Sequence, residues 1–301
     1  MSGMKTPVIE FDSVTKRYGK ARGVEDVTLA VQPGVVFGFL GPNGAGKSTA
    51  IHMMLDYIRP TNGEVRLFGL DAKVGAVEVH RRVGFLAGDM AMDGSLTGSQ
   101  QLEYLAHLRG GVDKKYLASL AKRLDCRLDR KFKTLSRGNK QKIGLIAALM
   151  HRPELLILDE PTSGLDPLMQ VEFNKIIAEH KASGGTVFVS SHVLSEIQEI
   201  CDEVTFIREG KVIATRPVSQ IAKDSPQKLV VRTNSKDLQS KLKKFSGFTV
   251  QVSSDGVLQG LFSGDVNKLL RLVSGYSVQQ FSLSEADLES VFMQYYEDPD
   301  A

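Results

Sequence analysis

The sequence predicts an α/β fold in two domains, and three observations lead to that prediction. Short apolar runs, typical of buried strands, alternate with helical segments over residues 1–216. A glycine-rich turn joins the apolar run 35–40 to the first helical segment. The composition then changes at residues 217–227, a polar stretch that we expect to be the linker to a smaller α+β domain over 228–301.

The first domain begins with strands and then contains a helical insertion. The strands are apolar and rich in β-branched residues, whereas the helices of the insertion carry apolar residues at helical spacing. We expect this insertion to be a subdomain over about residues 89–150. The predicted strands are 8–14, 24–31, 35–40, 61–69 and 83–87, and the predicted helices are 47–56, 101–108 and 115–124.

Further strands and helices complete the first domain. Apolar residues recur at helical spacing from Ile143 to Met150, and Pro153 follows them, so we expect a helix over 137–150. The unbroken apolar runs 155–159 and 186–191 are typical of a parallel sheet that is covered on both faces. A helix over 169–181 separates these runs, and residues 203–216 form a predicted hairpin.

The second domain has the order strand, helix, strand, strand, helix, strand, which is the ferredoxin-like pattern. A turn at Asp255 and Gly256 joins the two middle strands. A last amphipathic helix over 285–296 carries Leu288, Val291 and Phe292 on one face. The predicted strands are 228–233, 248–252, 257–262 and 277–283, and the other predicted helices are 236–245 and 265–274.

The composition argues against several classes of protein. A net charge of +3, with basic residues spread along the chain, gives little support for a nucleic-acid partner. We interpret the densest basic cluster, 114–133, as a solvated helical face, and a membrane-adjacent or partner-facing surface is the alternative. The two cysteines lack metal-ligand spacing and fit a reducing cytoplasm. Without a signal-peptide pattern or a run of about 18 apolar residues, we expect the chain neither to span a membrane nor to be secreted by that route.

The segment GPNGAGKST, residues 41–49, fits the phosphate-loop pattern G-x-x-x-x-G-K-[ST] between a strand and a helix. In such a loop the backbone amides hold phosphates, Lys47 reaches the β and γ phosphates, and the Ser48 hydroxyl coordinates Mg²⁺. We therefore expect a P-loop site for ATP and Mg²⁺. Its predicted contacts are Gly41, Asn43, Gly44, Ala45, Gly46, Lys47, Ser48 and Thr49.

Two carboxylates follow the buried run LLIL, at the sheet edge where ligands bind in α/β folds. We expect Asp159 to hold the Mg²⁺ shell and Glu160 to polarise the water that attacks the γ-phosphate. A strand end followed by a solvated acidic turn is the alternative. The phosphate loop in the same chain favours the catalytic interpretation.

The order of the motifs resembles the ATP-binding cassette family over about residues 7–216. The motifs are GPNGAGKST, LSRGNKQK from Leu135 to Lys142, LLILDEPTSGLDP, and SSH ending at His192. The resemblance implies a cassette with an antiparallel β subdomain and a helical subdomain. It also implies a head-to-tail dimer in which ATP lies between the phosphate loop of one copy and the signature segment of the other, here Ser136 and Gly138.

The same resemblance implies roles for three more residues. His192 occupies the place of the family's switch histidine, which contacts the γ-phosphate and helps to position the water. Asp166 ends the loop that crosses the dimer interface, and Tyr18 matches the aromatic residue that stacks on adenine. Judged without the family, Tyr18 would be a core residue and His192 a surface residue.

The chain departs from the family pattern at two places. Gly88 and Asp89 stand where most members have a glutamine that binds Mg²⁺, and Asp89 is a candidate replacement because a carboxylate oxygen suits Mg²⁺. In the signature, Arg137 replaces the usual glycine and Asn139 the usual glutamine. Arg137 would add a cation near the phosphates or lie along the interface.

The signature, the small second domain and the ending LSEADLESVFMQYY together resemble ATPase subunits of bacterial drug exporters of the bacitracin and daunorubicin type. That resemblance implies a dimer on a separate membrane permease, at the cytoplasmic face of the plasma membrane. Two alternatives stay open. One is a nucleotide-dependent switch that hydrolyses ATP poorly, and the other is a soluble cassette ATPase that has no part in transport.

Overall fold

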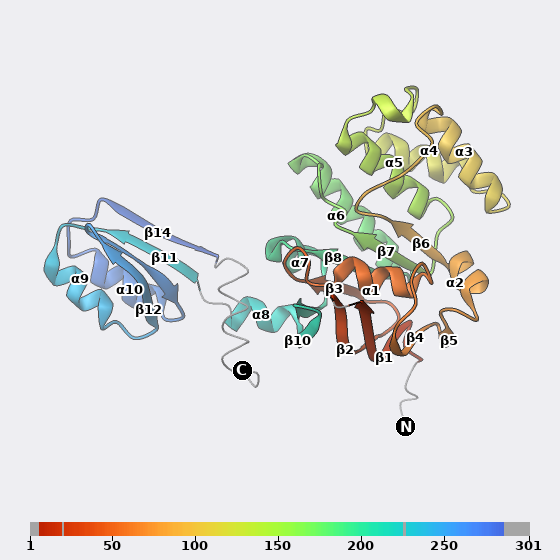
Figure 1. The fold of residues 1–301 in the computed structure, drawn as a ribbon. Coiled ribbons are helices and arrows are strands. Elements are labelled where there is room, and N and C mark those ends of the chain that lie inside the picture. Colours follow the sequence, from red (N-terminus) through yellow and green to blue (C-terminus); the bar gives the residue numbers. More distant parts are fainter. Residues whose placement is uncertain (1–5, 20, 225–226, 286–301) are drawn as a thin grey trace. The chain divides into compact units, whose positions relative to one another are not determined.

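The computed structural model describes residues 6–19, 21–224 and 227–285. The chain divides into two compact units, Met1–Val218 and Ser219–Ala301 (Figure 1). In the described residues, the first unit contains two sheets and a group of helices, and the second contains a sheet that packs with helices α9 and α10. The predicted helix 285–296 falls almost wholly in 286–301, outside the described residues.

A six-stranded sheet forms the centre of the first unit, in the order β10-β9-β3-β8-β7-β6. Neighbouring strands from β9 to β6 are parallel, and β10 is antiparallel to β9. Every residue of β3, β7 and β8 is buried, as their unbroken apolar runs predict. The strands are β3 Val36–Leu40, β6 Val83–Leu86, β7 Leu155–Asp159, β8 Thr186–Ser191, β9 Glu203–Arg208 and β10 Lys211–Pro217.

An antiparallel sheet of four strands, in the order β2-β1-β4-β5, lies beside the central sheet. Helix α1, Lys47–Met54, packs against both sheets, and its Ile51 and Met54 are fully buried in one core with Phe11 and Phe39. This packing anchors the helix that follows the phosphate loop. The strands are β1 Ile9–Tyr18, β2 Ala21–Val31, β4 Asn62–Leu67 and β5 Leu70–Asp71.

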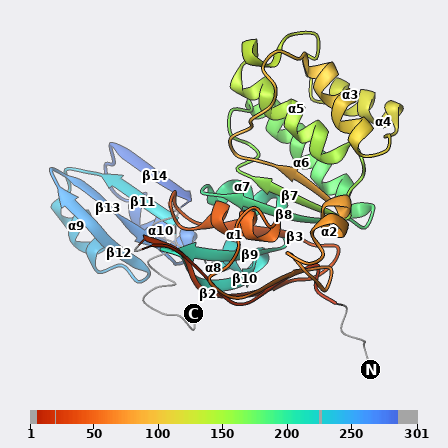
Figure 2. The same cartoon turned by 45° about the vertical axis from the view of Figure 1, so that its right-hand side comes forward.

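Helices α3, α4 and α5 form a group of their own, well separated from the antiparallel sheet (Figure 2). Helix α3 begins three residues earlier than predicted because Thr97 and Gln100 form a capping box. Arg123 joins α4 to α6 through ion pairs of 2.6 Å to Glu172 and 2.5 Å to Glu179. The helices of this unit are α2 Ala76–Arg82, α3 Gly98–Leu108, α4 Lys114–Arg123, η1 Phe132–Thr134, α5 Arg137–Leu149, α6 Pro167–Ala182 and α7 Leu194–Ile200.

The stretch 217–227, which we expected to be the linker between the domains, contains a helix. Its residues Val218–Asp224 form helix α8, and β11 begins at Gln227. Val218 and Ile221 are buried, and the Val218 amide donates to the Asp202 carbonyl at 2.8 Å.

The second unit has the element order β11-α9-β12-β13-α10-β14 and an antiparallel sheet in the order β12-β13-β11-β14. Ser235 and Asp265 cap the two helices, and their Leu238, Leu242 and Leu269 are fully buried against the sheet. The bounds are β11 Gln227–Arg232, α9 Lys236–Lys243, β12 Phe248–Ser254, β13 Val257–Phe262, α10 Val266–Val273 and β14 Gln280–Glu285.

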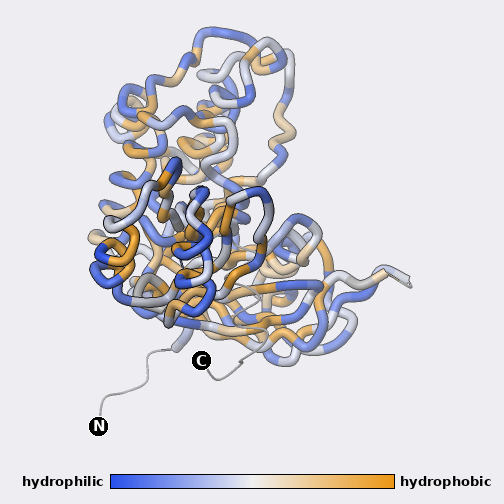
Figure 3. The backbone as a smooth tube through the Cα atoms, turned by 90° about the vertical axis from the view of Figure 1, so that its left-hand side faces the viewer, coloured by the Kyte–Doolittle hydropathy of each residue, from blue (hydrophilic) through white to orange (hydrophobic). Residues whose placement is uncertain are grey.

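Apolar and polar stretches alternate along the backbone instead of gathering in one long apolar segment (Figure 3). Among the described residues, no helix is both long and apolar enough to cross a membrane.

The substitution Gly84→Ala tests the close packing of β6 on α5. A Cβ at position 84 would lie 2.0 Å from the Ala148 backbone oxygen, so α5 would have to move. We expect the free energy of unfolding to fall by about 1–3 kcal/mol, measured by urea or thermal unfolding. Gly275→Ala is the control, because its Cβ would meet nothing closer than 3.8 Å. Equal unfolding midpoints for Gly84→Ala and wild type would contradict the packing argument.

Candidate active site

The glycine-rich turn after β3 is built so that only glycine fits at two of its positions. A Cβ on Gly41 would lie 2.2 Å from the Ile207 carbonyl oxygen, and Gly46 has a φ of 108° and lies against the Gly23 carbonyl. The Gly41 amide donates to the Ser191 carbonyl at 3.2 Å, which fixes the start of the turn to β8. The turn then enters α1, whose first amides can hold an anion.

Lys47 is 6% exposed, and its side chain folds back into this turn. Its Nζ donates to the carbonyls of Gly41 at 2.6 Å and Pro42 at 3.3 Å, and it lies 3.2 Å from Glu160 Oε1. The buried ammonium is thus neutralised by one carboxylate and solvated by two carbonyls. A phosphate group in the turn would offer Lys47 a second negative partner.

Ser48 and Asp159 bring oxygen atoms together from α1 and the end of β7. The Ser48 hydroxyl donates to Asp159 Oδ2 at 2.8 Å, and the Ser190 hydroxyl donates to Asp159 Oδ1. Hydroxyl and carboxylate oxygens at this spacing are the donors that Mg²⁺ prefers, so these residues fit the ion. Ser190 is a contact that sequence reasoning missed; its signal was a serine inside an otherwise apolar strand.

Glu160 and His192 form a pair just beyond the ends of β7 and β8. Glu160 has a φ of 50°, and its amide donates to the carbonyl and the hydroxyl oxygen of Ser190, each at 3.2 Å. Its Oε2 lies 2.7 Å from His192 Nδ1. When the carboxylate is ionised, Nδ1–H is the donor of this bond, and Nε2 is the ring nitrogen that remains for a ligand or water.

Gln141 of α5 binds the backbone of the turn that begins at Glu160. Its Nε2 donates to the carbonyls of Glu160 at 3.3 Å and Pro161 at 3.1 Å, and its side chain is buried. A left-handed backbone on a non-glycine residue costs about 1–2 kcal/mol, and these bonds hold Glu160 in that conformation. Gln141 belongs to the segment LSRGNKQK, but its spacing alone did not predict this contact.

Tyr18 lies at the end of β1 with 48% of its surface exposed. Its ring is adjacent to Gly23, where a Cβ would meet Tyr18 Cε2 at 2.9 Å and Thr49 Cγ2 at 3.1 Å. Lys16 Nζ lies 5.4 Å from the ring centroid. The ring is therefore an accessible aromatic surface close to the end of the phosphate loop, and Tyr18 is not the buried residue that its sequence context would suggest.

The signature residues gather around another turn, 163–166. Ser136 caps α5 by accepting from the Asn139 amide, and a Cβ on Gly138 would lie 2.4 Å from the Gly164 carbonyl. Arg137 donates to the Ser163 hydroxyl at 2.8 Å. Asp166 caps α6 through the Met169 amide at 3.1 Å. The structure thus brings Ser136, Gly138 and Asp166 together, and it groups Lys47, Ser48, Asp159, Glu160 and His192 separately.

Position 88 faces the Asp159 carboxylate. A Cβ on Gly88 would lie 3.5 Å from both Cγ and Oδ2 of Asp159, which is ordinary van der Waals contact. The neighbouring Asp89 is exposed. The residue that points toward the oxygen cluster is therefore the one without a side chain, and Asp89 as a ligand stays a prediction.

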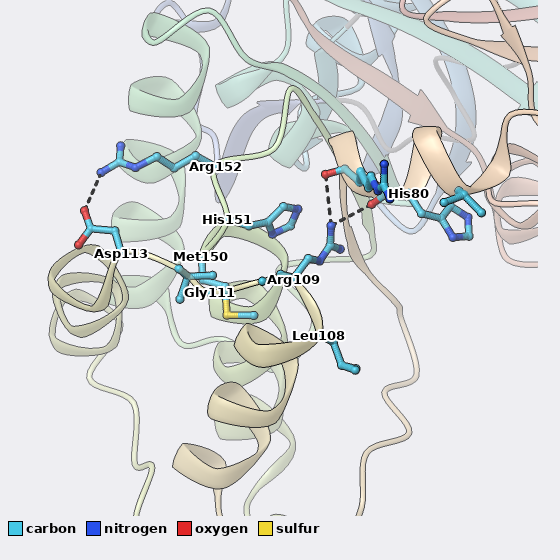
Figure 4. Close-up of a pocket in the computed structure, with 12 residues that line it drawn as sticks. His80, Leu108, Arg109, Gly111, Asp113, Met150, His151 and Arg152 are labelled. Carbon is cyan, nitrogen blue, oxygen red and sulfur yellow. Dashed lines mark hydrogen bonds and ion pairs between the residues drawn. The ribbon is translucent and has the colours of Figure 1, made fainter.

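A second hollow of about 930 Å³ lies between α2, the α3–α4 connection and the turn after α5 (Figure 4). Arg109 crosses it to donate to the carbonyls of His80 at 2.8 Å and Val83 at 3.2 Å. Burial lowers the pKa of His151 to about 4, so its ring is neutral, and Nε2–H donates to the Val83 carbonyl at 3.1 Å. The hollow also has an apolar rim, because Val77 is 72% and Leu108 is 67% exposed.

A parallel sheet with a phosphate loop, a buried aspartate against the loop serine and a carboxylate–histidine pair defines a P-loop nucleotide-binding protein. The ABC transporter family model matches residues 24–163. The chain is 36% identical over 295 residues to the bacitracin transport ATP-binding protein BcrA of Enterococcus faecalis, with 95% of each chain covered. It is 31% identical to the daunorubicin/doxorubicin resistance ATP-binding protein DrrA of Streptomyces peucetius, over 97% of this chain and 93% of that protein.

Two solved structures agree with this result. An ATP-binding subunit of an ABC transporter superposes with a TM-score of 0.65 at 28% identity, over 72% of this chain and 92% of that one. A dimeric bacterial ABC transporter cassette has the same fold, with a TM-score of 0.64 at 21% identity, over 70% of this chain and 98% of that one. The chain belongs to the ATP-binding proteins of the ABC transporter family, which are ATPases.

The substitution Gly88→Gln tests whether position 88 reaches the metal ligands. The side chain has room beside Asp159, and its amide oxygen would add a donor for Mg²⁺. We expect half-maximal ATP turnover at a Mg²⁺ concentration about 3- to 10-fold lower, or about 0.7–1.4 kcal/mol, measured by a Mg²⁺ titration. Gly88→Ala is the control, since it fills the space without a ligand. Identical Mg²⁺ dependence of the two variants would contradict the expectation.

Proposed function

We propose that this chain is the ATP-hydrolysing subunit of an exporter of the bacitracin or daunorubicin-resistance type, and that two copies act on a separate permease. The observation that carries the proposal is Glu160. Its carboxylate lies at the sheet edge, 3.2 Å from Lys47 Nζ and 2.7 Å from His192 Nδ1. A carboxylate between the phosphate-loop lysine and a histidine is suited to orient a water for attack on the γ-phosphate.

In this proposal each residue of the first group has one task. The phosphate-loop amides and Lys47 bind the β and γ phosphates of ATP, and the exposed Tyr18 ring stacks on the adenine. Ser48 and Asp159 hold Mg²⁺, which supplies charge neutralisation on the phosphate oxygens when it is bound. Glu160 accepts the proton of the attacking water as the bond from the γ-phosphorus to ADP breaks. His192, oriented by Glu160, donates a hydrogen bond to the departing phosphate.

The second group, Ser136 and Gly138, supports a head-to-tail dimer. These residues stand at the N-terminus of the 13-residue helix α5, where backbone amides favour an anion. Their close contacts in the described part of the chain are with α5 itself and with Gly164. Such an end is free to meet the γ-phosphate bound to a second copy. We infer that Asp166 also lies at this dimer interface, because its turn, 163–166, contains Gly164, which contacts Gly138.

The permease contact is proposed at the hollow between α2 and the α3–α4 connection (Figure 4). Exposed Val77 and Leu108 offer apolar surface there, next to Arg81 and Arg152. A cytoplasmic segment of a permease that carries apolar and acidic residues fits this surface. The subunit would then lie at the inner face of the plasma membrane, with a ferredoxin-like second unit as an accessory domain of the dimer.

One observation favours a second candidate function. Position 88 has no side chain beside Asp159, so one Mg²⁺ ligand of the usual site is missing. A chain of this kind could close on ATP and hydrolyse it slowly, as a nucleotide-dependent switch. Steady-state turnover separates the two functions.

The substitution Glu160→Gln tests the proposed base. The amide cannot accept the proton of the water, so we expect turnover to fall by about 10²- to 10⁴-fold while ATP binding persists. The measurements are phosphate release and equilibrium binding of ATP with Mg²⁺. Glu103→Gln is the control, because Glu103 is exposed on α3. Equal, near-zero turnover of wild type and Glu160→Gln would reject the enzyme in favour of the switch.

The substitution Leu108→Glu tests the permease surface. We expect the subunit to lose at least about 10-fold, or 1.4 kcal/mol, in affinity for membranes that contain the permease encoded beside its gene. Membrane pelleting measures this loss, and turnover of the isolated subunit should stay unchanged. Val74→Glu is the control, because Val74 is 87% exposed but does not line the hollow. If Leu108→Glu pelleted with the membranes as wild type does, the permease would not bind at this hollow.

A further inference from the structure

We propose that Glu196 is a positioning residue for ATP hydrolysis, because its carboxylate ties the turn after Glu160 to the segment that carries His192. Oε1 accepts from the Thr162 hydroxyl at 2.7 Å, and Oε2 accepts from the Ser191 hydroxyl at 2.8 Å. The proposal rests on the roles given above to Glu160 and His192. It adds a residue that does not touch either of them.

Each arm of this clamp ends next to one member of the pair. Thr162 follows Glu160 by two residues, and Ser191 directly precedes His192. The Ser191 hydroxyl also accepts from the Val193 amide at 3.0 Å, so its bonds enclose the backbone of His192 from both sides. One carboxylate therefore sets the separation of the two segments whose side chains meet at 2.7 Å.

The clamp acts where the sheet no longer does. Pairing of β7 with β8 ends at Asp159 and Ser190, and Glu160 adds one last bond back to Ser190. Beyond that point the segment after β7 continues to α6, and the segment after β8 continues into α7. Helix α7 returns Glu196 to the gap between them. Ser190 and Gln141 hold the backbone of Glu160 but do not hold His192.

The two hydroxyls depend on Glu196 because little of either residue is exposed to water. Thr162 is 7% exposed and Ser191 is 1% exposed. A buried donor without an acceptor is unfavourable, so the loss of the carboxylate forces the two segments to rearrange. A displacement of about 1 Å at a catalytic pair is enough to slow a reaction by about 10²-fold. Within the described residues, the hydrogen bonds of Lys47 go to Gly41 and Pro42 and those of Glu196 go to Thr162 and Ser191, so ATP affinity should change little.

The experiment compares steady-state ATP turnover of the full chain with Glu196→Ala, Glu196→Gln and Glu199→Ala. We expect kcat of Glu196→Ala to fall by about 10- to 100-fold, with KM for ATP within about 3-fold of wild type. Glu196→Gln should recover part of the loss, because its amide accepts from one hydroxyl and donates to the other. Glu199→Ala should match wild type, since Glu199 lies on the same helix, is exposed and accepts a hydrogen bond from Asn174 at 2.7 Å.

A second set of variants guards against misfolding and isolates the mechanism. Thr162→Val and Ser191→Ala each remove one arm, and each should lower kcat less than Glu196→Ala does. Glu160→Gln combined with Glu196→Ala should lose less turnover than the product of the two single losses, because Glu196 positions the pair to which Glu160 belongs. ATP binding by the double variant, measured directly, shows that the fold is intact.

Three results would overturn the proposal. The first is a kcat of Glu196→Ala within 2-fold of wild type. The second is a loss that appears in KM instead of kcat, which would indicate a structural effect on nucleotide binding. The third is a loss of turnover in the double variant equal to the product of the two single losses, which would show that Glu196 and Glu160 act independently. If Glu160→Gln alone kept wild-type turnover, the assignment of Glu160 as the base would fail, whatever the Glu196 variants showed.

Discussion

The parallel pairing of β3, β8 and β7 is the constraint on which the rest of the site depends. Leu40 pairs with Ser191, and Ser190 pairs with Asp159, so the three strands end at the same level. The phosphate loop, the carboxylates and the histidine segment therefore leave the sheet at one edge. All residues of these strands are buried, and a slip in register would move the polar ends into the apolar core. The position of the catalytic groups is thus set by hydrophobic burial in the sheet.

Electrostatics at that edge depends on a single lysine. Lys47 is buried and shared between Glu160 and two carbonyls of the phosphate loop. In the proposed function, a bound γ-phosphate would compete with Glu160 for this ammonium, and the buried setting would make the competition stronger than it is in water. The side chain of Glu160 would then keep its hydrogen bond to His192 while its ion pair with Lys47 weakens. Nucleotide binding and the orientation of Glu160 are coupled through this exchange of partners.

Local motifs predicted the first group of site residues because each of these motifs corresponds to one backbone feature, such as a turn or a strand end. The phosphate-loop pattern and the acidic end of an apolar run pointed to Lys47, Ser48, Asp159 and Glu160, which are neighbours in the structure, and their roles stay predictions. Side chains that act across the fold had no such signal. Glu196 lies on a helix that the pattern did not predict, and its partners are 34 and 5 residues away. The sequence could not tell whether position 88 or position 89 faces Asp159. Strand β6 ends at Leu86, so the alternation of side chains along a strand does not extend to these positions.

The replacement of glycine by Arg137 strengthens a connection within one subunit. Gly138 already lies against Gly164 with no space for a side chain, and Arg137 adds a 2.8 Å bond to Ser163. Ser163 follows Thr162, which Glu196 binds, and its amide donates to the Glu160 carbonyl at 3.2 Å. A displacement of the α5 N-terminus would therefore shift the turn that begins at Glu160. In the proposed dimer that N-terminus meets the ATP of the second copy. Binding at one site would then act on the proposed base of the other through the contacts of Arg137 and Ser163.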